Sequence, residues 1–458
     1  MKKIPTILLI TIIGLSTSLL FAGGEKEEKG SFTMEDVSKQ PSGELIVTPQ
    51  LIGYEDAQIE LTWQPCPPHS MLSTQQARVD DIYSKATAWV KNHPNVKIVP
   101  VGTTSNVSDN MTKLRVTVTE GGAPDLCAVD SFMMPLFKQY AQPLNEYIED
   151  ANINSDDFFP YIQNTVMDGD DLLALWYTTD VRGLYYRKDL IDTPPTNVNE
   201  MISIAKDVQN SNPNMTGLVY CGGRDEASVN NLWGLYWSQG ASLVDENGDI
   251  AFDEGSNKDA MLKFLQFFER TIDEGVTKTN VINYKKESDM YGDVQAGSVA
   301  MFIGGNWAIN QLRDLITIDE FNSKWGFAPL PTMNENEEST SSAGGWTNIV
   351  FTKDPLKKEL AASLAIALYS SDEAQESWTR VGGYLPTRKS QYDKFEYIKA
   401  DPYLQDTLVM LNQASTRPAV ELYSIISSET QVAIGEIITG SKTPEEALKS
   451  LINNVKNY

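Results

Sequence analysis

Three consecutive segments near the start of the folded part set the fold class of this chain. Residues 59–63 (IELTW) alternate apolar and polar side chains as a half-buried strand does, residues 80–92 place apolar side chains on one face of a helix, and residues 96–100 (VKIVP) form a second strand-like run. A strand, a helix and a strand at this spacing make the βαβ unit of a parallel sheet. Because 458 residues exceed what one compact core usually holds, we expect an α/β fold in two lobes.

The charge balance excludes one large class of partners. The chain has 37 Lys and Arg against 62 Asp and Glu, a formal net charge of -25. Proteins that bind nucleic acid need a basic surface to neutralise phosphates, and the sequence contains no basic run. Nucleic acid and other polyanions are therefore not expected as partners.

The N-terminus has the pattern of an export signal. Two lysines precede an apolar run at 7–21, and small residues follow that run. The run is shorter than the ~20 residues of a membrane-spanning helix, so export is favoured over a permanent anchor, with cleavage and retention both open. We predict a signal peptide at 1–22, a flexible charged leader at 23–56, and a periplasmic or extracytoplasmic location.

The cysteines provide neither a disulfide framework nor a metal site. Cys66, Cys127 and Cys221 are widely spaced and form no CxxC pair. One disulfide plus a free thiol, or three buried thiols, would both fit this spacing. We favour buried thiols because Cys127 lies in an apolar strand-like run.

A pair of glycines followed by a tryptophan occurs twice. Gly304 and Gly305 end an apolar strand-like run and precede Trp307, and Gly345 precedes Trp346 in a second Gly-Gly-Trp segment. Glycine lets a backbone approach another group closely, and tryptophan offers an apolar face and an N–H donor. Core packing explains either tryptophan alone equally well. Two such elements on either side of residues 325–331 instead favour facing walls of one cleft.

Other polar and aromatic residues beside predicted breaks complete a candidate binding site. A neutral polyol needs aromatic faces, carboxylates that accept hydrogen bonds, and Arg groups that donate them. The predicted ligand-binding residues are Trp63, Asp130, Asp180, Arg224, Trp307, Gly345, Trp346, Tyr384 and Arg417.

The sequence contains few of the residues and motifs that common catalytic sites require. His69 and His93 are the only histidines, and the common hydrolase, zinc-protease, dinucleotide and phosphate-loop motifs do not occur. Glycoside hydrolysis needs only two carboxylates, so a secreted glycoside hydrolase that uses a pair among Asp125, Asp130, Asp180 and Glu226 is the rival hypothesis. With 62 acidic residues, however, plausible pairs arise by chance. We predict no catalytic residues, no metal site and no cofactor.

Five segments, in chain order, resemble one family. The segments are GGAPD with PLNEYI within 121–148, YTTDVRGLYYRKDL at 177–190, QAGSVAMFIGGNWAINQ at 295–311, WGFAPLP at 325–331 and GGYLPTR at 382–388. Together they resemble the bacterial extracellular solute-binding proteins that serve sugar ABC transporters. Many proteins of that type carry a lipid-anchoring cysteine after the export signal, and this chain has none there.

The resemblance implies a two-lobed periplasmic-binding-protein fold of class II, with crossover hinge strands that let the lobes close over a sugar. It implies a first lobe of 57–180 plus 332–384 and a second of 181–331 plus 385–458. Asp130 and Asp180 would accept sugar hydroxyls, Trp307 and Trp346 would stack on ring faces, and Arg417 would donate. The expected partners are a small carbohydrate and the transmembrane permease subunits, with the protein a monomer. A chemoreceptor or adhesion ligand with this fold would differ in its partner protein.

Overall fold

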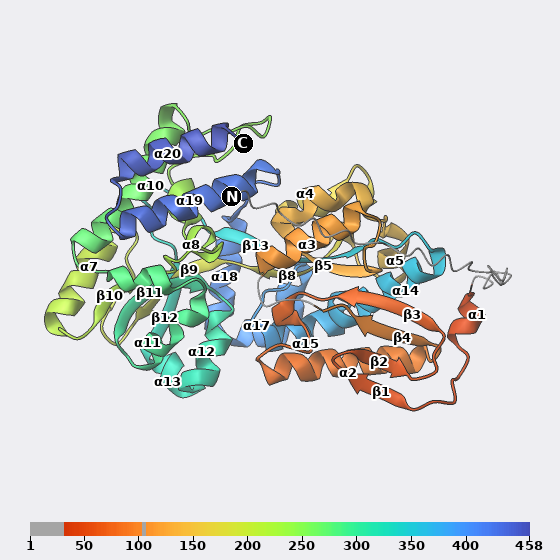
Figure 1. Cartoon of the computed structure of the whole chain (residues 1–458). Helices are drawn as coiled ribbons and strands as arrows, with labels where there is room; N and C mark the ends of the chain where they lie inside the picture. Colours follow the sequence, from red (N-terminus) through yellow and green to blue (C-terminus); the bar gives the residue numbers. More distant parts are fainter. Residues whose placement is uncertain (1–31, 103–106) are drawn as a thin grey trace, which may run out of the picture.

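The protein forms two α/β lobes, each built on its own sheet, and the computed structural model describes residues 32–102 and 107–458 (Figure 1). The first sheet has the order β1-β2-β4-β3-β5-β13-β14, with β8 also paired to β13. Its strands are β1 (Leu45–Thr48), β2 (Leu51–Tyr54), β3 (Ile59–Gln64), β4 (Val96–Pro100), β5 (Leu126–Asp130), β8 (Leu175–Asp180), β13 (Ser342–Val350) and β14 (Ser415–Thr416).

The second sheet has the order β10-β11-β9-β12. Strand β9 pairs antiparallel with both β11 and β12, whereas β10 pairs parallel with β11. The strands are β9 (Arg182–Arg187), β10 (Thr216–Val219), β11 (Val299–Gly305) and β12 (Trp325–Pro329), and β6 (Met167–Asp168) with β7 (Asp171–Leu172) forms a separate small hairpin.

The predicted βαβ unit is confirmed. Strands β3 and β4 are parallel and are joined by α2 (Gln76–Asn92), which buries Ile82, Ala86 and Val90 against the first sheet. The predicted α/β class and two-lobed architecture follow from this unit and from the second sheet.

The remaining helices cover the two sheets (Figure 1). In chain order they are α1 (Met34–Val37), α3 (Val107–Thr119), α4 (Met134–Phe137), α5 (Asn145–Asp150), α6 (Pro160–Val166), α7 (Val198–Ser211), α8 (Ala227–Asn230), α9 (Trp233–Trp237), α10 (Gly255–Asp273), α11 (Tyr291–Gln295), α12 (Ala308–Ile316), α13 (Ile318–Lys324), α14 (Pro355–Ala365), α15 (Asp372–Gly382), α16 (Ser390–Lys394), α17 (Glu396–Ala400), α18 (Pro402–Asn412), α19 (Leu422–Ile438) and α20 (Pro444–Lys456). Among the described helices, none combines the length and apolar character that a membrane crossing requires.

The chain crosses between the lobes at several points. Strand β8 runs almost directly into β9 through Val181, and residues 330–341 lead from β12 back to β13. A third crossing segment begins at Gly383 after α15, runs along the first lobe and reaches the second lobe only at α18, and a fourth connects β14 to α19. These crossings bring residues that are distant in sequence to one junction.

The leader is more ordered than predicted. The predicted export signal and the first part of the leader lie outside the described residues. Within 32–56, however, α1 forms and β1 and β2 make an antiparallel hairpin whose Ile52 pairs with Ile98 of β4. The apolar residues of this hairpin extend the first sheet, which a flexible leader would not do.

The second lobe also begins later than the predicted residue 385. Leu385 bridges to Thr179, and the Nη2 of Arg388 donates to the carbonyl of Ser370 at 3.0 Å. Residues 385–394 therefore pack on the first-lobe side. The prediction of buried thiols is confirmed, since all three cysteines are free and buried.

Candidate functional site

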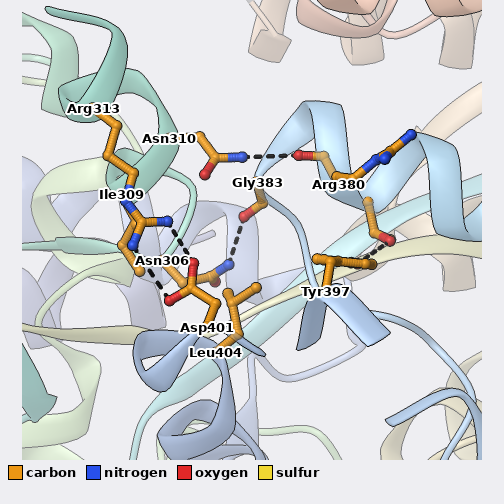
Figure 2. Close-up of a pocket in the computed structure, with 10 residues that line it drawn as sticks. Asn306, Ile309, Asn310, Arg313, Arg380, Gly383, Tyr397, Asp401 and Leu404 are labelled. Atoms are coloured by element: carbon orange, nitrogen blue, oxygen red, sulfur yellow. Dashed lines mark hydrogen bonds and ion pairs between the residues drawn. The ribbon is translucent and has the colours of Figure 1, made fainter. Parts of the chain in front are cut away.

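A cavity of about 200 Å³ lies where α12 meets the end of α15 and the helices α17 and α18 (Figure 2). Its polar lining groups bind one another: Arg313 pairs with Asp401, and Asn310 donates to the carbonyl of Arg380. None of the predicted site residues is among those that line it. The cavity is therefore not the predicted binding site.

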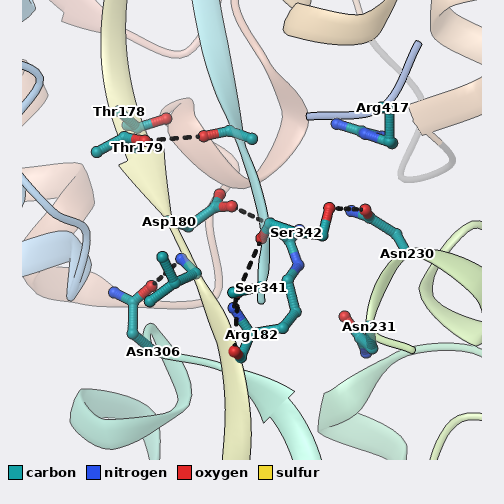
Figure 3. A network of polar contacts seen from close by, with 12 residues as sticks. Thr178, Thr179, Asp180, Arg182, Asn230, Asn231, Asn306, Ser341, Ser342 and Arg417 are labelled. Atoms are coloured by element: carbon teal, nitrogen blue, oxygen red, sulfur yellow. Dashed lines mark hydrogen bonds and ion pairs between the residues drawn. The ribbon is translucent and has the colours of Figure 1, made fainter. Parts of the chain in front are cut away.

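Five charged residues meet at the lobe junction instead, and we call them the junction cluster: Asp130, Asp180, Arg182, Glu226 and Arg417. Figure 3 shows Asp180, Arg182 and Arg417 of this cluster. The two aspartates end β5 and β8, which places them at strand ends where ligands of open α/β sheets bind. Glu226 lies between β10 and α8 in the second lobe, and Arg417 follows β14.

Arg417 links the two lobes. Its Nη2 donates to Asp130 Oδ1 at 2.7 Å, and its Nη1 donates to Glu226 Oε1 at 3.2 Å. Glu226 also accepts from the hydroxyls of Tyr423 and Ser427. The guanidinium carbon lies 4.3 Å from the centre of the Phe132 ring, and Arg417 is only 5% exposed. The arrangement holds a planar cation between a carboxylate of each lobe.

Asp180 and Arg182 form a second ion pair at the β8–β9 crossing. Residues two apart on an extended strand face the same side, so both side chains point toward Arg417 (Figure 3). Arg182 also donates to the carbonyl of Ser342 at 3.1 Å. A Cβ on Gly344 would lie 3.2 Å from the Arg417 Nη2 and 3.5 Å from both Arg182 Nη1 and Asp180 Oδ1. A larger residue at 344 would therefore crowd all three side chains.

Burial governs the electrostatics of the cluster. It raises the pKa of Asp130, and the nearby carboxylates of Glu226 and Asp180 raise it further, while Arg417 acts in the opposite direction. Burial also opposes the charge of Arg417, but Asp130 and Glu226 together raise the pKa of its guanidinium. Three carboxylates face two guanidinium groups, which disfavours an anionic ligand.

Trp307 lies next to the cluster. It precedes α12, it is half-buried, and the guanidinium carbon of Arg182 lies 5.0 Å from the centre of its ring. The predicted tryptophan of the first Gly-Gly segment therefore stands beside Asp180 and Arg182, with part of its surface open.

Trp346 and Tyr384 belong to a neighbouring buried aromatic group. Trp346 pairs with Asp130 of β5 along β13, and its ring lies edge-on to His69 at 5.9 Å. Tyr384 binds the Nε2 of His69 through its hydroxyl at 2.7 Å. The close approach of a neighbouring backbone explains why residue 345 is a glycine. A Cβ at this position would lie 1.8 Å from the carbonyl of Thr178.

The sequence pattern of bacterial extracellular solute-binding proteins matches residues 75–376. The chain belongs to this family. A probable ABC transporter-binding protein of Deinococcus radiodurans is 27% identical over 394 residues, covering 81% of this chain and 89% of that protein. A maltotriose-binding protein of Pyrococcus abyssi is 21% identical, and the match covers 78% of this chain and 74% of that protein. The resemblance inferred from the five sequence segments is thus confirmed.

Solved structures confirm the fold of this solute-binding protein. A maltose-bound structure of T. maritima MalE3 has a TM-score of 0.74 at 24% identity, with 87% of this chain and 99% of the other covered. The maltose-maltodextrin binding protein of Alicyclobacillus acidocaldarius has a TM-score of 0.68 at 17% identity, with 87% and 100% covered. The family is extracellular, which places this protein outside the cytoplasm.

Besides Trp307, Gly345, Trp346 and Tyr384, two more predicted residues of this solute-binding protein lie outside the junction cluster. Trp63 is 0% exposed in the core of the first lobe, and Arg224 is exposed two residues before Glu226. Sequence reasoning did not select Arg182, although its position two residues after Asp180 in an extended run was a usable signal. Glu226 was not among the predicted ligand-binding residues, because its partner Arg417 lies far away in sequence.

Proposed function

We propose that this solute-binding protein captures a carbohydrate between its lobes and delivers it to the permease of an ABC transporter. Relatives named for maltodextrin and maltotriose binding, from Bacillus subtilis and Pyrococcus abyssi, support a sugar as the ligand. The probable ABC transporter-binding protein of Deinococcus radiodurans supports the transporter as partner. The ligand class we favour is a neutral glucose oligosaccharide.

The bridging position of Arg417 carries this proposal. It contacts Asp130 of the first lobe and Glu226 of the second, so a ligand that binds these three groups would join both lobes. Carboxylates and a guanidinium offer paired acceptors and donors that suit adjacent sugar hydroxyls. Trp307 adds an aromatic surface beside them. Such a ligand binds one arrangement of the lobes better than another and shifts the open–closed equilibrium toward it.

The charged groups do not favour the glycoside hydrolase alternative. A glycosidase needs one protonated acid and one anionic partner across the scissile bond. In the junction cluster, Glu226 accepts from Arg417, Tyr423 and Ser427, and Asp180 pairs with Arg182. Both carboxylates are thus already engaged by donors of the protein itself. We therefore propose binding without catalysis.

The location and assembly of the protein complete the proposal. We infer that residues 1–22 direct export and that the protein acts as a monomer, releasing its sugar to permease subunits in the membrane. The formal net charge of -25 argues against nucleic acid as a partner.

A thermal-shift and calorimetry screen tests the proposal. Glucose, maltose and maltotriose are added to the purified protein, with glycerol as a polyol control, and the sugars are afterwards analysed by chromatography. We expect stabilisation by at least one sugar and none by glycerol, because a ligand that binds only the folded state raises Tm. The sugar should be recovered intact. A folded protein that no sugar stabilises would contradict the proposal, and shortened sugar chains would favour the hydrolase.

A further inference from the structure

Asn306 occupies a buried position between the end of β11 and the start of α12. It is 0% exposed, and it separates Gly305 from Trp307 in the sequence Gly-Gly-Asn-Trp. Its backbone N–H donates to the carbonyl of Val181 at 3.0 Å, and its Oδ1 accepts from the N–H of Val181 at 2.9 Å. Val181 is the residue between β8 and β9. Asn306 therefore binds both the N–H and the carbonyl of the residue at the first crossing.

The remaining polar group of Asn306 reaches another crossing. Its Nδ2 donates to the carbonyl of Gly383 at 2.8 Å. Gly383 caps α15 with a φ of 69°, and two residues later Leu385 pairs with Thr179 of β8. One side chain therefore joins the β8–β9 crossing and the start of the third crossing segment to the end of β11. In Figure 3 Asn306 lies on the side of the β8–β9 strand opposite Arg417.

Trp307 extends this connection to the junction cluster. It directly follows Asn306, and its ring lies 5.0 Å from the guanidinium carbon of Arg182, the first residue after Val181. A Cβ on Gly305 would lie 2.1 Å from the Trp307 ring, so the turn packs closely. A displacement of either crossing at Asn306 would therefore be passed to Trp307 through a single peptide unit.

We propose that Asn306 is a positioning residue that couples the crossings to Trp307, so that the closed arrangement of the lobes sets the aromatic wall of the binding site. This role rests on the proposed capture of a sugar between the lobes. Asn306 itself touches no ligand in this account, because it is buried on the far side of the crossing strand. Asn306 and Gly383 both line the adjoining cavity of about 200 Å³. Because this space is not filled by side chains, the hydrogen bond between Asn306 and Gly383, rather than packing, holds that crossing.

The chain offers a matched control. Asn310, one turn further along α12, donates its Nδ2 to the carbonyl of Arg380 at 2.9 Å and so joins the same two helices, α12 and α15. Its amide donates to Arg380 and not to Val181 or Gly383, although the side chain packs beside Gly383. Asn310→Ala removes a bond between the same elements without releasing a crossing.

Paired spin labels measure the coupling. The three native cysteines are buried, so Val116→Cys on α3 and Ser424→Cys on α19 can be labelled selectively; both positions are exposed. The two helices face each other across the junction, since Arg115 pairs with Glu421 at 2.7 Å. Asn306→Asp keeps the size of the side chain and the acceptor for Val181 but cannot donate to Gly383, and Asn306→Ala removes both side-chain bonds.

We expect both Asn306 variants to broaden the ligand-free distance distribution and to weaken maltotriose binding about tenfold, while Asn310→Ala matches the wild type in both. A change in only one of the two readouts, or in neither, would overturn the coupling. If the wild type does not bind maltotriose, glucose or maltose, the proposed function fails separately. In that case the spin-label distance distribution of the ligand-free protein tests the coupling by itself. If this distribution is the same in the Asn306 variants as in the wild type, the inference is overturned. Should Asn306→Asp not fold, Asn306→Ala decides.

Discussion

The Nη2 of Arg417 lies 2.7 Å from the Oδ1 of Asp130, although 287 residues separate them in the chain. Asp130 ends a strand of the first lobe, whereas the segment after Arg417 enters α19, which packs on α10 in the second lobe. Arg417 directly follows β14 of the first sheet, and its Nη1 also reaches Glu226 Oε1 of the second lobe at 3.2 Å, so this pair of contacts depends on how the two lobes are placed. Removing it should affect ligand capture more than it affects either lobe alone.

Arg417→Ala should weaken sugar binding by about tenfold to 100-fold, because charged hydrogen bonds contribute roughly 1.5–3 kcal/mol. Calorimetry with the sugar identified by screening measures the loss. Arg388→Ala is the control, since Arg388 is also buried and paired with a carboxylate, Asp372, away from the cluster. It should lower Tm and leave affinity unchanged. Equal losses of affinity in both variants would place Arg417 among purely structural residues.

Trp307→Ala should reduce affinity far more than stability, because part of the ring is open beside Arg182. Trp89→Ala offers the comparison, since Trp89 is 4% exposed on α2 and its loss should cost about 3–5 kcal/mol of folding stability. Thermal unfolding and sugar titration are measured on both variants. A large Tm loss with unchanged affinity in Trp307→Ala would return this residue to the core.

His69 should make stability depend on pH. Its Nδ1 and Nε2 lie 2.9 and 2.7 Å from the hydroxyls of Tyr177 and Tyr384, and burial, with a further contribution from Arg78, lowers its pKa well below 6.5. A histidine with a lowered folded-state pKa stabilises the fold above its ordinary pKa and loses that contribution as pH falls below 6.5.

The difference in Tm between about pH 7.5 and about pH 5.5 measures this effect. We expect a smaller difference in His69→Gln than in the wild type, because glutamine carries no proton that titrates in this range. His93→Gln, at the end of α2, should keep the wild-type difference. The hypothesis fails if His69→Gln retains the full pH dependence.

The ion pair between Arg115 and Glu421 should contribute little. Both side chains are more than half exposed, at 51% and 64%. Exposed pairs contribute about 0.2–1 kcal/mol and are screened by salt. Arg115→Gln should therefore lower affinity only slightly at low ionic strength and not at all at high salt. A large loss that persists at high salt would show that α3 contacts the ligand directly.

Local sequence patterns predicted the helices and strands better than they predicted which residues come into contact between them. The βαβ unit, the acidic strand ends at Asp130 and Asp180, and the glycine-tryptophan turn at Trp307 follow from spacing and residue type within short windows. The burial of Trp63 does not, since a tryptophan at a strand end suits both core and cleft. Glu226 and Arg417 meet only because the two lobes meet at the junction, where Arg417 directly follows β14 of the first sheet.

The ordered hairpin in the leader was also missed. Charged residues at 25–29 suggested that the whole leader is flexible, but LIVT at 45–48 and LIGY at 51–54 are apolar enough to extend the sheet. Gly345 was predicted to bind ligand because glycine permits close approach. The close approach is real, but the approaching group is the carbonyl of Thr178.

Calorimetric titration of the purified wild-type protein and of Arg417→Ala with maltotriose tests the central claim most directly. The account predicts saturable binding with one sugar per chain, an affinity at least about tenfold weaker in the variant, and intact sugar at the end of the titration. Undiminished binding in Arg417→Ala would contradict the assigned site. The absence of binding by a folded wild type, extended to glucose and maltose, would contradict capture of a neutral glucose oligosaccharide.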